Sequence, residues 1–273
     1  MKDVKSILAG LSYKFDGDFQ KIFDAICHKQ RIEETEVDAA LSNITTPFIT
    51  ILDADYPEFF RNGAPKPPIV IYYKGDLEIL TRTDPRNLVS FVGSRKSSHY
   101  GESVVRDIIK NLPKDIVIVS GLAKGIDATA HNAAIDYGLK TIAVLGCGID
   151  YIYPKENEAL YNRIIESGGL IISEYPNSVA PTPDKFCFRN RIVADIGSFL
   201  VIGEAYERSG TSITVNYALN AGKGIGCVPY PANVKSACNA LIKDGAAMIE
   251  NSDDLLLQLG RNIINDTKSK KAE

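Results

Sequence analysis

The sequence predicts an α/β protein with a doubly wound, mainly parallel sheet and a small helical region at its N-terminus. Apolar runs of strand length alternate with segments of helical periodicity, and most of these runs end at a glycine-containing turn. The runs are almost uninterrupted by polar residues, as expected for parallel strands that helices cover on both faces. The 273 residues are 45% hydrophobic and 24% charged, which is the composition of a globular chain with a sizeable core.

The first 45 residues are expected to form short helices. Apolar side chains recur there at helical spacing, at Phe19, Ile22, Phe23 and Ile26. A proline-rich crossing follows at 57–68, where four prolines in twelve residues forbid a regular helix and favour an extended path into the apolar segment 69–73.

From residue 87 the pattern becomes strand, turn and helix, repeated. The expected strands are 88–92, 116–119, 141–145, 170–172, 199–202 and 224–228. The expected helices are 101–111, 128–137, 161–167, 189–196, 211–221 and 253–259. This alternation is typical of a parallel sheet with right-handed crossovers.

We expect three parts in the chain: a helical region at 1–45, the α/β domain at 46–260, and a flexible Lys-rich tail at 261–273. No apolar run approaches the length of a membrane span, and the first residues lack the apolar core of a secretion signal, so a cytoplasmic protein without membrane contact is expected. Five scattered cysteines and three histidines do not predict a metal or a cofactor.

The charge is unevenly distributed. The net charge of −3 argues at first against a nucleic-acid partner, but residues 1–60 carry 6 Lys/Arg against 11 Asp/Glu. The stretch 81–114 holds seven basic and three acidic residues. A basic pocket on a near-neutral domain is therefore compatible with the sequence.

Ligands of an open α/β sheet bind beyond the carboxyl ends of its strands. The loops expected at that edge are Gly93-Ser94-Arg95, Ser120 to Gly125 with Gly121 and Lys124, Gly146 to Gly148, Ser173-Glu174, and Ser209-Gly210-Thr211. Glycine lets a backbone approach closely, and hydroxyls and free N–H groups at helix starts attract anions. Because two of these loops also carry a cation, the edge predicts phosphate binding.

The motifs of common phosphate chemistry are absent from the sequence. Neither a Walker A loop, nor the dinucleotide fingerprint, nor a nucleophile elbow, nor an HExxH motif is present. Asp127 and His131 lie one helical turn apart, but the more plain interpretation is a carboxylate in the first helical turn and a packed or solvated histidine. We therefore expect a site that binds a ligand and is not an enzyme active site.

The segment Lys185-Phe-Cys-Phe188-Arg189-Asn190-Arg191 interleaves two aromatic rings with three cations. Cations bridge successive phosphates, and an aromatic ring offers a stacking surface to an unpaired base. We expect one phenylalanine in the core and the other beside the ligand. The alternative is a helix start with both rings in the core and the arginines in solvent.

Taken together, these motifs resemble the DNA-processing protein A family (DprA, also called Smf). The resemblance spans about residues 45–250. Its motifs are Tyr56-Pro57, 68–75, 92–95, 120–127 with 130–131, 145–150 with 153–154, 172–176, Phe186-x-x-Arg-Asn-Arg191, 209–211 and 239–246.

This resemblance implies an extended Rossmann-like domain that binds single-stranded DNA without hydrolysing it. It further implies a protein that protects incoming strands in natural transformation, helps to load the RecA recombinase and forms a homodimer, with the dimer surface near Ile249 and 255–259. Carried over to this sequence, the DNA-binding residues are Gly93, Ser94, Arg95, Phe186, Arg189, Asn190 and Arg191, with Gly121, Lys124, Ser209 and Gly210 on the same edge.

The sequence departs from the family pattern in places. The family often has a lysine a few positions before the motif phenylalanine, where this chain has Pro183, so Lys185 is expected to replace it. The loop at 228–231 and the short N-terminal region also differ.

Two alternatives remain. Rossmann-like proteins resembling the LOG phosphoribohydrolases use a glutamate that falls on Thr214 here, and a hydroxyl of ordinary acidity does not replace that carboxylate. The second alternative is a protein that only binds other proteins, in which the glycine-rich edge is a vestigial pocket.

Overall fold

The computed structural model describes residues 2–206 and 210–261. Within them the chain forms one nine-stranded sheet in the order β1-β2-β6-β5-β4-β3-β7-β8-β9. β2 pairs antiparallel with β1 and β6, and every other neighbouring pair is parallel. The predicted doubly wound, mainly parallel class is therefore confirmed.

The strands coincide with the apolar runs. Their bounds are β1 Phe48–Thr50, β2 Val70–Gly75, β3 Leu88–Gly93, β4 Val117–Ser120, β5 Lys140–Leu145, β6 Leu170–Ser173, β7 Phe199–Glu204, β8 Gly224–Cys227 and β9 Ala247–Met248. All six expected strands are present, and β1, β2 and β9 extend the sheet at its two edges. β3, β4, β6 and β7 are buried along almost their whole length, which explains their unbroken apolar sequence.

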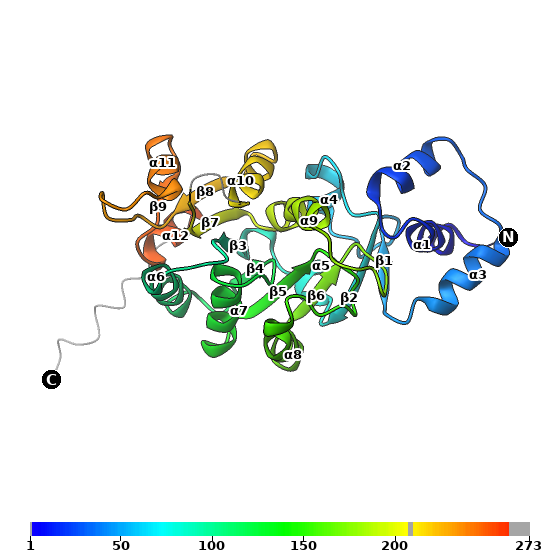
Figure 1. The fold of residues 1–273 in the computed structure, drawn as a ribbon, viewed down its shortest axis with the longest axis horizontal. Coiled ribbons are helices and arrows are strands. Elements are labelled where there is room, and N and C mark those ends of the chain that lie inside the picture. The colour runs from blue at the N-terminus through cyan, green and yellow to red at the C-terminus, as the bar shows by residue number, and fades with distance from the viewer. Residues whose placement is uncertain (1, 207–209, 262–273) are drawn as a thin grey trace.

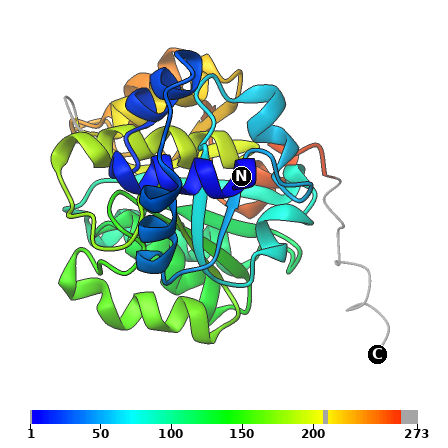
Figure 2. The ribbon, with the colours of Figure 1, turned by 90° about the vertical axis from the view of Figure 1, so that its right-hand side faces the viewer.

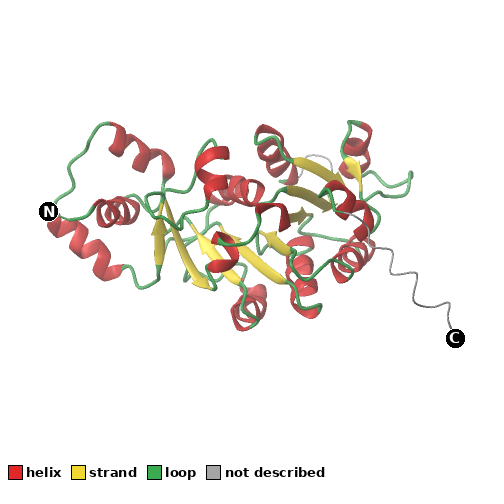
Figure 3. Cartoon of the chain, turned by 180° about the vertical axis from the view of Figure 1, so that it is seen from behind, coloured by secondary structure: helices red, strands yellow, loops and turns green. Residues whose placement is uncertain are grey.

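Helices cover both faces of the sheet (Figures 1 and 3). One face packs against α6 His99–Lys110, α7 Ile126–Asp136, α8 Glu158–Glu166 and α12 Ser252–Gln258. The other packs against α4 Glu58–Gly63, α5 Glu78–Thr81, α9 Pro183–Ile196, α10 Thr211–Asn220 and α11 Ala237–Lys243. Two short 3-10 helices, Pro85–Asn87 and Lys155–Asn157, directly precede β3 and α8. Within the described residues no helix is both long and apolar enough to cross a membrane.

Three helices precede the sheet: α1 Val4–Lys14, α2 Phe19–Cys27 and α3 Glu34–Asn43. They lie beyond the β1 edge, at one end of the molecule (Figures 1 and 2). Asp3 and Asp18 cap α1 and α2 by accepting backbone hydrogen bonds at 2.7 and 3.1 Å. The Tyr72 hydroxyl, on β2, reaches Ser12 of α1 at 3.1 Å. The three-part division of the chain stays a prediction, and of its expected tail at 261–273 only Arg261 lies within the described residues.

Two expectations need correction. α9 begins at Pro183 and not at Arg189, because proline is well tolerated in the first helical turn, where its missing N–H costs nothing. Ile249 and Leu255 are fully buried in this chain's own core, so they are not available to a dimer surface, whereas Leu257 is 64% exposed.

The strand order creates a switch point between β3 and β7. The chain leaves β3 toward β4, β5 and β6 on one side and then returns to β7 on the other side of β3. In doubly wound folds, crossovers that diverge in this way open a crevice at the carboxyl ends of the two strands.

Candidate nucleic-acid interface

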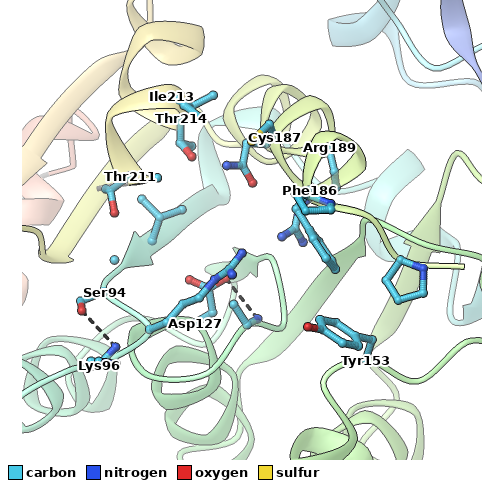
Figure 4. Close-up of a pocket in the computed structure, with 18 of the residues that line it drawn as sticks. Ser94, Lys96, Asp127, Tyr153, Phe186, Cys187, Arg189, Thr211, Ile213 and Thr214 are labelled. Carbon is cyan, nitrogen blue, oxygen red and sulfur yellow. Dashed lines mark hydrogen bonds between the residues drawn. The ribbon is translucent and has the colours of Figure 1, made fainter. Parts of the chain in front are cut away.

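A hollow of about 680 Å³ lies at the carboxyl ends of β3 and β7 (Figure 4). We call it the main hollow. One part of its lining comes from the end of β3, the strand-end loops and the first turn of α7: residues 92–96, Ala123, Asp127 and Tyr153. The other part comes from α9 and α10 and the segments before them: residues 181–183, 186, 187, 189, 190, 206, 210, 211, 213 and 214. Side chains from α9 and α10 face one another across it, above the loop after β3 (Figure 4).

The loop after β3 is held by backbone hydrogen bonds. The Ser94 N–H donates to the Glu204 carbonyl at 2.7 Å, and the Lys96 N–H donates to the Ser94 hydroxyl oxygen at 3.0 Å. Gly125 has a φ of +73°, and a Cβ there would lie 2.2 Å from the Ser94 carbonyl oxygen. This fixed turn leaves the side chains of Arg95 and Lys96 exposed at the edge of the main hollow.

Arg189 supplies a buried cation. Arg189 is 3% exposed. Its Nη1 donates to the Gly121 carbonyl oxygen at 2.5 Å and also to the Val144 carbonyl oxygen. Its Nε has no hydrogen-bond partner among the described residues. Burial lowers the pKa of the guanidinium, which shows that its charge is poorly solvated. An anion in the main hollow would stabilise it.

Asp127 is the carboxylate of the main hollow. It is 7% exposed and accepts a hydrogen bond from the Ala123 N–H at 3.3 Å. Burial raises its pKa, while the nearby charge of Arg189 opposes this effect. Among residues 2–206 and 210–261 the lining carries three cations, Arg95, Lys96 and Arg189, against one carboxylate, so this part of the main hollow is net positive.

An aromatic stack forms one wall. The rings of Tyr153 and Phe186 stack (Figure 4), with centroids 5.2 Å apart at 28°. The Arg95 guanidinium lies 5.7 Å from the Phe186 centroid. A Cβ on Gly146 would lie 2.6 Å from the Phe186 ring, so glycine makes room for it. Tyr153 is 43% exposed, which leaves its ring open to a flat partner.

His131 has no part in the site. It is fully buried on α7, and its Nδ1 lies 2.7 Å from the Thr141 hydroxyl. Burial lowers its pKa to about 3. As the sequence indicated, Asp127 occupies the first turn of α7 and His131 is packed.

Most of the predicted binding residues meet at this place. Those lining the main hollow are Gly93, Ser94, Arg95, Phe186, Arg189, Asn190 and Gly210. Gly121 and Lys124 line an adjoining cavity of about 80 Å³, together with Arg95, Phe186 and Arg189. Lys124 pairs there with Glu156 at 2.5 Å. Ser209 lies outside the described residues.

Arg191 departs from the expectation. It is 3% exposed and forms a two-pronged ion pair with Glu174, at 2.7 and 2.5 Å. Its guanidinium lies 3.7 Å from the Phe188 ring centroid. Residues two apart on an α-helix point in nearly opposite directions, so Arg189 and Arg191 cannot share one hollow. Lys185 also lies outside the main hollow and lines a second one.

Sequence reasoning missed several lining residues. Lys96 directly follows the predicted loop residue Arg95 and could have been included on that ground. Tyr153 comes from the loop between β5 and α8, and no local signal indicates that it returns to Phe186. Thr214 also lines the main hollow and is 2% exposed, so a hydroxyl stands where the LOG enzymes would need a carboxylate, and that interpretation is not favoured. No group of three or more potential metal ligands occurs within residues 2–206 and 210–261.

The sequence is similar to those of known proteins. Residues 47–260 match the family described as DNA recombination-mediator protein A. The chain is 38% identical to the DNA processing protein DprA of Streptococcus pneumoniae over 214 residues, which is 78% of this chain and 74% of that protein. It is 39% identical to protein Smf of Synechocystis over 78% of this chain, but this match covers only 54% of that longer protein.

Two solved structures are similar. The X-ray structure of the Streptococcus pneumoniae protein superposes with a TM-score of 0.76 and 33% identity, covering 93% of this chain and 92% of that one. DNA processing protein A of Helicobacter pylori, whose structure was described for its single-stranded DNA binding mode, gives a TM-score of 0.69 and 28% identity over 80% and 97% of the two chains. By fold and by sequence, this chain belongs to the DNA recombination-mediator protein A family.

Proposed function

We propose that the chain binds single-stranded DNA in the main hollow and does not cleave it. The observation that carries this proposal is the placement of a buried arginine with an unpartnered Nε, Arg189, next to an open aromatic stack, Tyr153 and Phe186. A phosphate can accept a hydrogen bond from the Nε of Arg189, and an unpaired base can stack on the two rings. The related Helicobacter pylori protein is described as binding single-stranded DNA, which supports the same ligand here.

The residues divide into two roles. Arg95, Lys96 and Arg189 contact phosphates, and the close backbone at Gly93 and Ser94 allows the strand to approach. Asn190 and Gly210 border the same path. Tyr153 and Phe186 hold a base by stacking, which is accessible only to a base that is not paired. Phosphate and stacking contacts do not read base edges, so sequence preference is expected to be weak.

The chemistry of the main hollow favours binding over bond cleavage. Asp127 is buried in the first turn of α7 and accepts a hydrogen bond from a backbone N–H, and Thr214 offers only an ordinary hydroxyl. Neither forms a nucleophile–base couple with a histidine, since His131 bonds to Thr141 instead. In cells the bound strand is then protected and passed on intact.

The proposal extends to the partners that the family resemblance implies. As a recombination mediator, the protein protects incoming strands during natural transformation, helps to load the RecA recombinase onto them, and acts as a homodimer in the cytoplasm.

Fluorescence anisotropy of a labelled oligothymidylate tests the proposal. Arg95→Ala should weaken binding about tenfold and reduce the log–log salt slope by about 0.7, the value for one lost phosphate contact on a single strand. Arg82→Ala is the matched control, because Arg82 is exposed, does not line the main hollow and forms a surface ion pair with Glu78. The proposal would be contradicted if Arg95→Ala bound the oligothymidylate as tightly as Arg82→Ala does. It would also be contradicted if the wild-type chain bound duplex DNA as tightly as single-stranded DNA.

A further inference from the structure

A second hollow of about 580 Å³ lies between the N-terminal helices and α9. Its lining comes from five separate parts of the chain, two of which are the loop after β6, at Tyr175, and α10, at Tyr217. Phe19 and Lys21 belong to α2, Lys66 to the proline-rich crossing, and Lys185 and Phe188 to α9. α2 lies outside residues 47–260, so this hollow combines a family segment with an N-terminal one.

Like the main hollow, the second hollow places cations beside aromatic rings, but its described lining carries three lysines and three aspartates and so has no net charge. The rings of Phe19 and Phe188 lie 6.1 Å apart, and the Lys66 ammonium is 5.9 and 6.0 Å from their centroids. The Lys185 ammonium is 5.9 Å from the centroid of Tyr175. Within the described part of the chain, neither Lys66 nor Lys185 has a carboxylate within 4.0 Å. The Lys185 ammonium does donate to the Ala180 carbonyl at 3.2 Å, but neither this bond nor the ring contacts neutralise the two cations, so both can meet phosphates.

The two hollows adjoin at the first turns of α9. Phe186 faces the main hollow, Lys185 and Phe188 face the second, and Cys187 lines both. Cys187 is exposed, so a strand that leaves the Phe186 stack can cross the helix there to reach the second hollow.

The floor of the second hollow is rigid. Arg191 lies against Phe188 and is fixed by its ion pair with Glu174. Its Nε donates to the Lys66 carbonyl at 3.0 Å. This buried network positions the Lys66 backbone and the Phe188 ring before any ligand arrives, which reduces the cost of ordering them.

We infer that the second hollow holds further bases of the same single strand, so that the N-terminal helices take part in DNA binding; this inference rests on the proposed function. Aspartates also line the hollow, at Asp16, Asp18 and Asp184. Asp18 is engaged by the α2 cap and by Lys21 at 3.5 Å. These carboxylates exclude a continuous row of phosphates, so bases enter and Lys66 and Lys185 contact the flanking phosphates.

A length series of oligothymidylates tests this inference. In the wild-type chain, affinity should increase in a further step once the oligonucleotide is long enough to extend from the main hollow past Cys187 into the second hollow. The double variant Lys66→Ala/Lys185→Ala should bind the shortest ligands normally and lose about tenfold on the longer ones, with a salt slope lower by about 1.4 for two lost contacts. Lys74→Ala is the matched control, because Lys74 also lies over an aromatic ring, at 5.8 Å from Tyr161, but lines neither hollow.

The outcomes separate the two proposals. If the double variant loses affinity equally at every length, or at none, the second hollow does not hold the strand. If instead Arg95→Ala leaves binding of the shortest ligands unchanged, the assignment of the main hollow fails, whatever the double variant does. Lys66→Ala keeps the backbone carbonyl that accepts from Arg191, so the variant is expected to fold.

Discussion

The guanidinium of Arg189 sits directly against the backbone of Gly121. Its Nη1 donates to the Gly121 carbonyl at 2.5 Å, and a Cβ on that glycine would lie 2.5 to 2.6 Å from three guanidinium atoms. The glycine at the end of β4 therefore determines where the buried cation of the main hollow can lie. Its role is steric, because its φ lies outside the left-handed region.

Gly121→Ala should displace Arg189 and so affect both stability and binding. The added methyl overpacks a buried contact, which lowers the free energy of unfolding by about 1–3 kcal/mol. Affinity for an oligothymidylate should fall at least about tenfold, since one phosphate contact is misplaced. Urea unfolding and anisotropy measure the two effects. Gly63→Ala is the control, because nothing lies within 4 Å of a Cβ there; equal behaviour of the two variants would refute the steric role.

Arg191 and Arg95 should give opposite results when each is replaced by alanine. Removing Arg191 leaves Glu174 buried without its partner, which is expected to cost about 3–5 kcal/mol of unfolding free energy. Removing the exposed Arg95 should change stability by less than about 0.5 kcal/mol but weaken DNA binding. Chemical unfolding measures the stability of both variants, and fluorescence anisotropy measures their affinity for the oligothymidylate. A stable Arg191→Ala protein with lost binding would return Arg191 to the DNA site.

The fold was predictable because its signals are local. β3, β4 and β7 are apolar at nearly every position, and the glycine turn after each is readable in sequence. β1 and β9 were not predicted, because strands of three and two residues carry too little pattern and are defined by their neighbours. The start of α9 was placed too late, because a proline-rich approach conceals the fact that Pro183 is itself helical.

The loops of the site were predictable, and its helix α9 only in part. Gly93, Ser94 and Arg95 follow a strand, so the edge on which they lie is known from the sheet. The expected helix at 189–196 already directs Arg189 and Arg191 to nearly opposite sides, but the sequence does not show which of the two faces the main hollow. Sequence alone also gives no sign that Glu174, after β6, would neutralise Arg191.

Asp195 should make stability depend on pH. It is 5% exposed on α9, and burial raises its pKa to about 6, opposed by Arg191 and Lys223. A raised carboxyl pKa means that the folded state binds the proton more tightly, so the penalty is present above pH 6 and disappears as pH falls toward 4. Relative to the ordinary 3.8 this corresponds to about 3 kcal/mol.

Asp195→Asn should therefore unfold at higher urea than the wild type at neutral pH, and this difference should vanish near pH 4. Asp107→Asn, at an exposed position of α6, serves as the control and should follow the wild type throughout. A constant difference across the pH range would show that the effect comes from packing and not from titration.

Tyr153 and Tyr151 form a matched pair for testing base stacking. Their exposures are 43% and 42%, but only Tyr153 lines the main hollow and stacks on Phe186. A lost stacking partner costs about 1–3 kcal/mol per base, so Tyr153→Ala should weaken oligothymidylate binding about tenfold or more, while Tyr151→Ala should not. Tyr153→Phe should restore binding, because the ring and not the hydroxyl meets the base. The salt slope should stay unchanged in Tyr153→Ala, since no phosphate contact is removed; a lowered slope would mean that the variant disturbs the Arg95 loop.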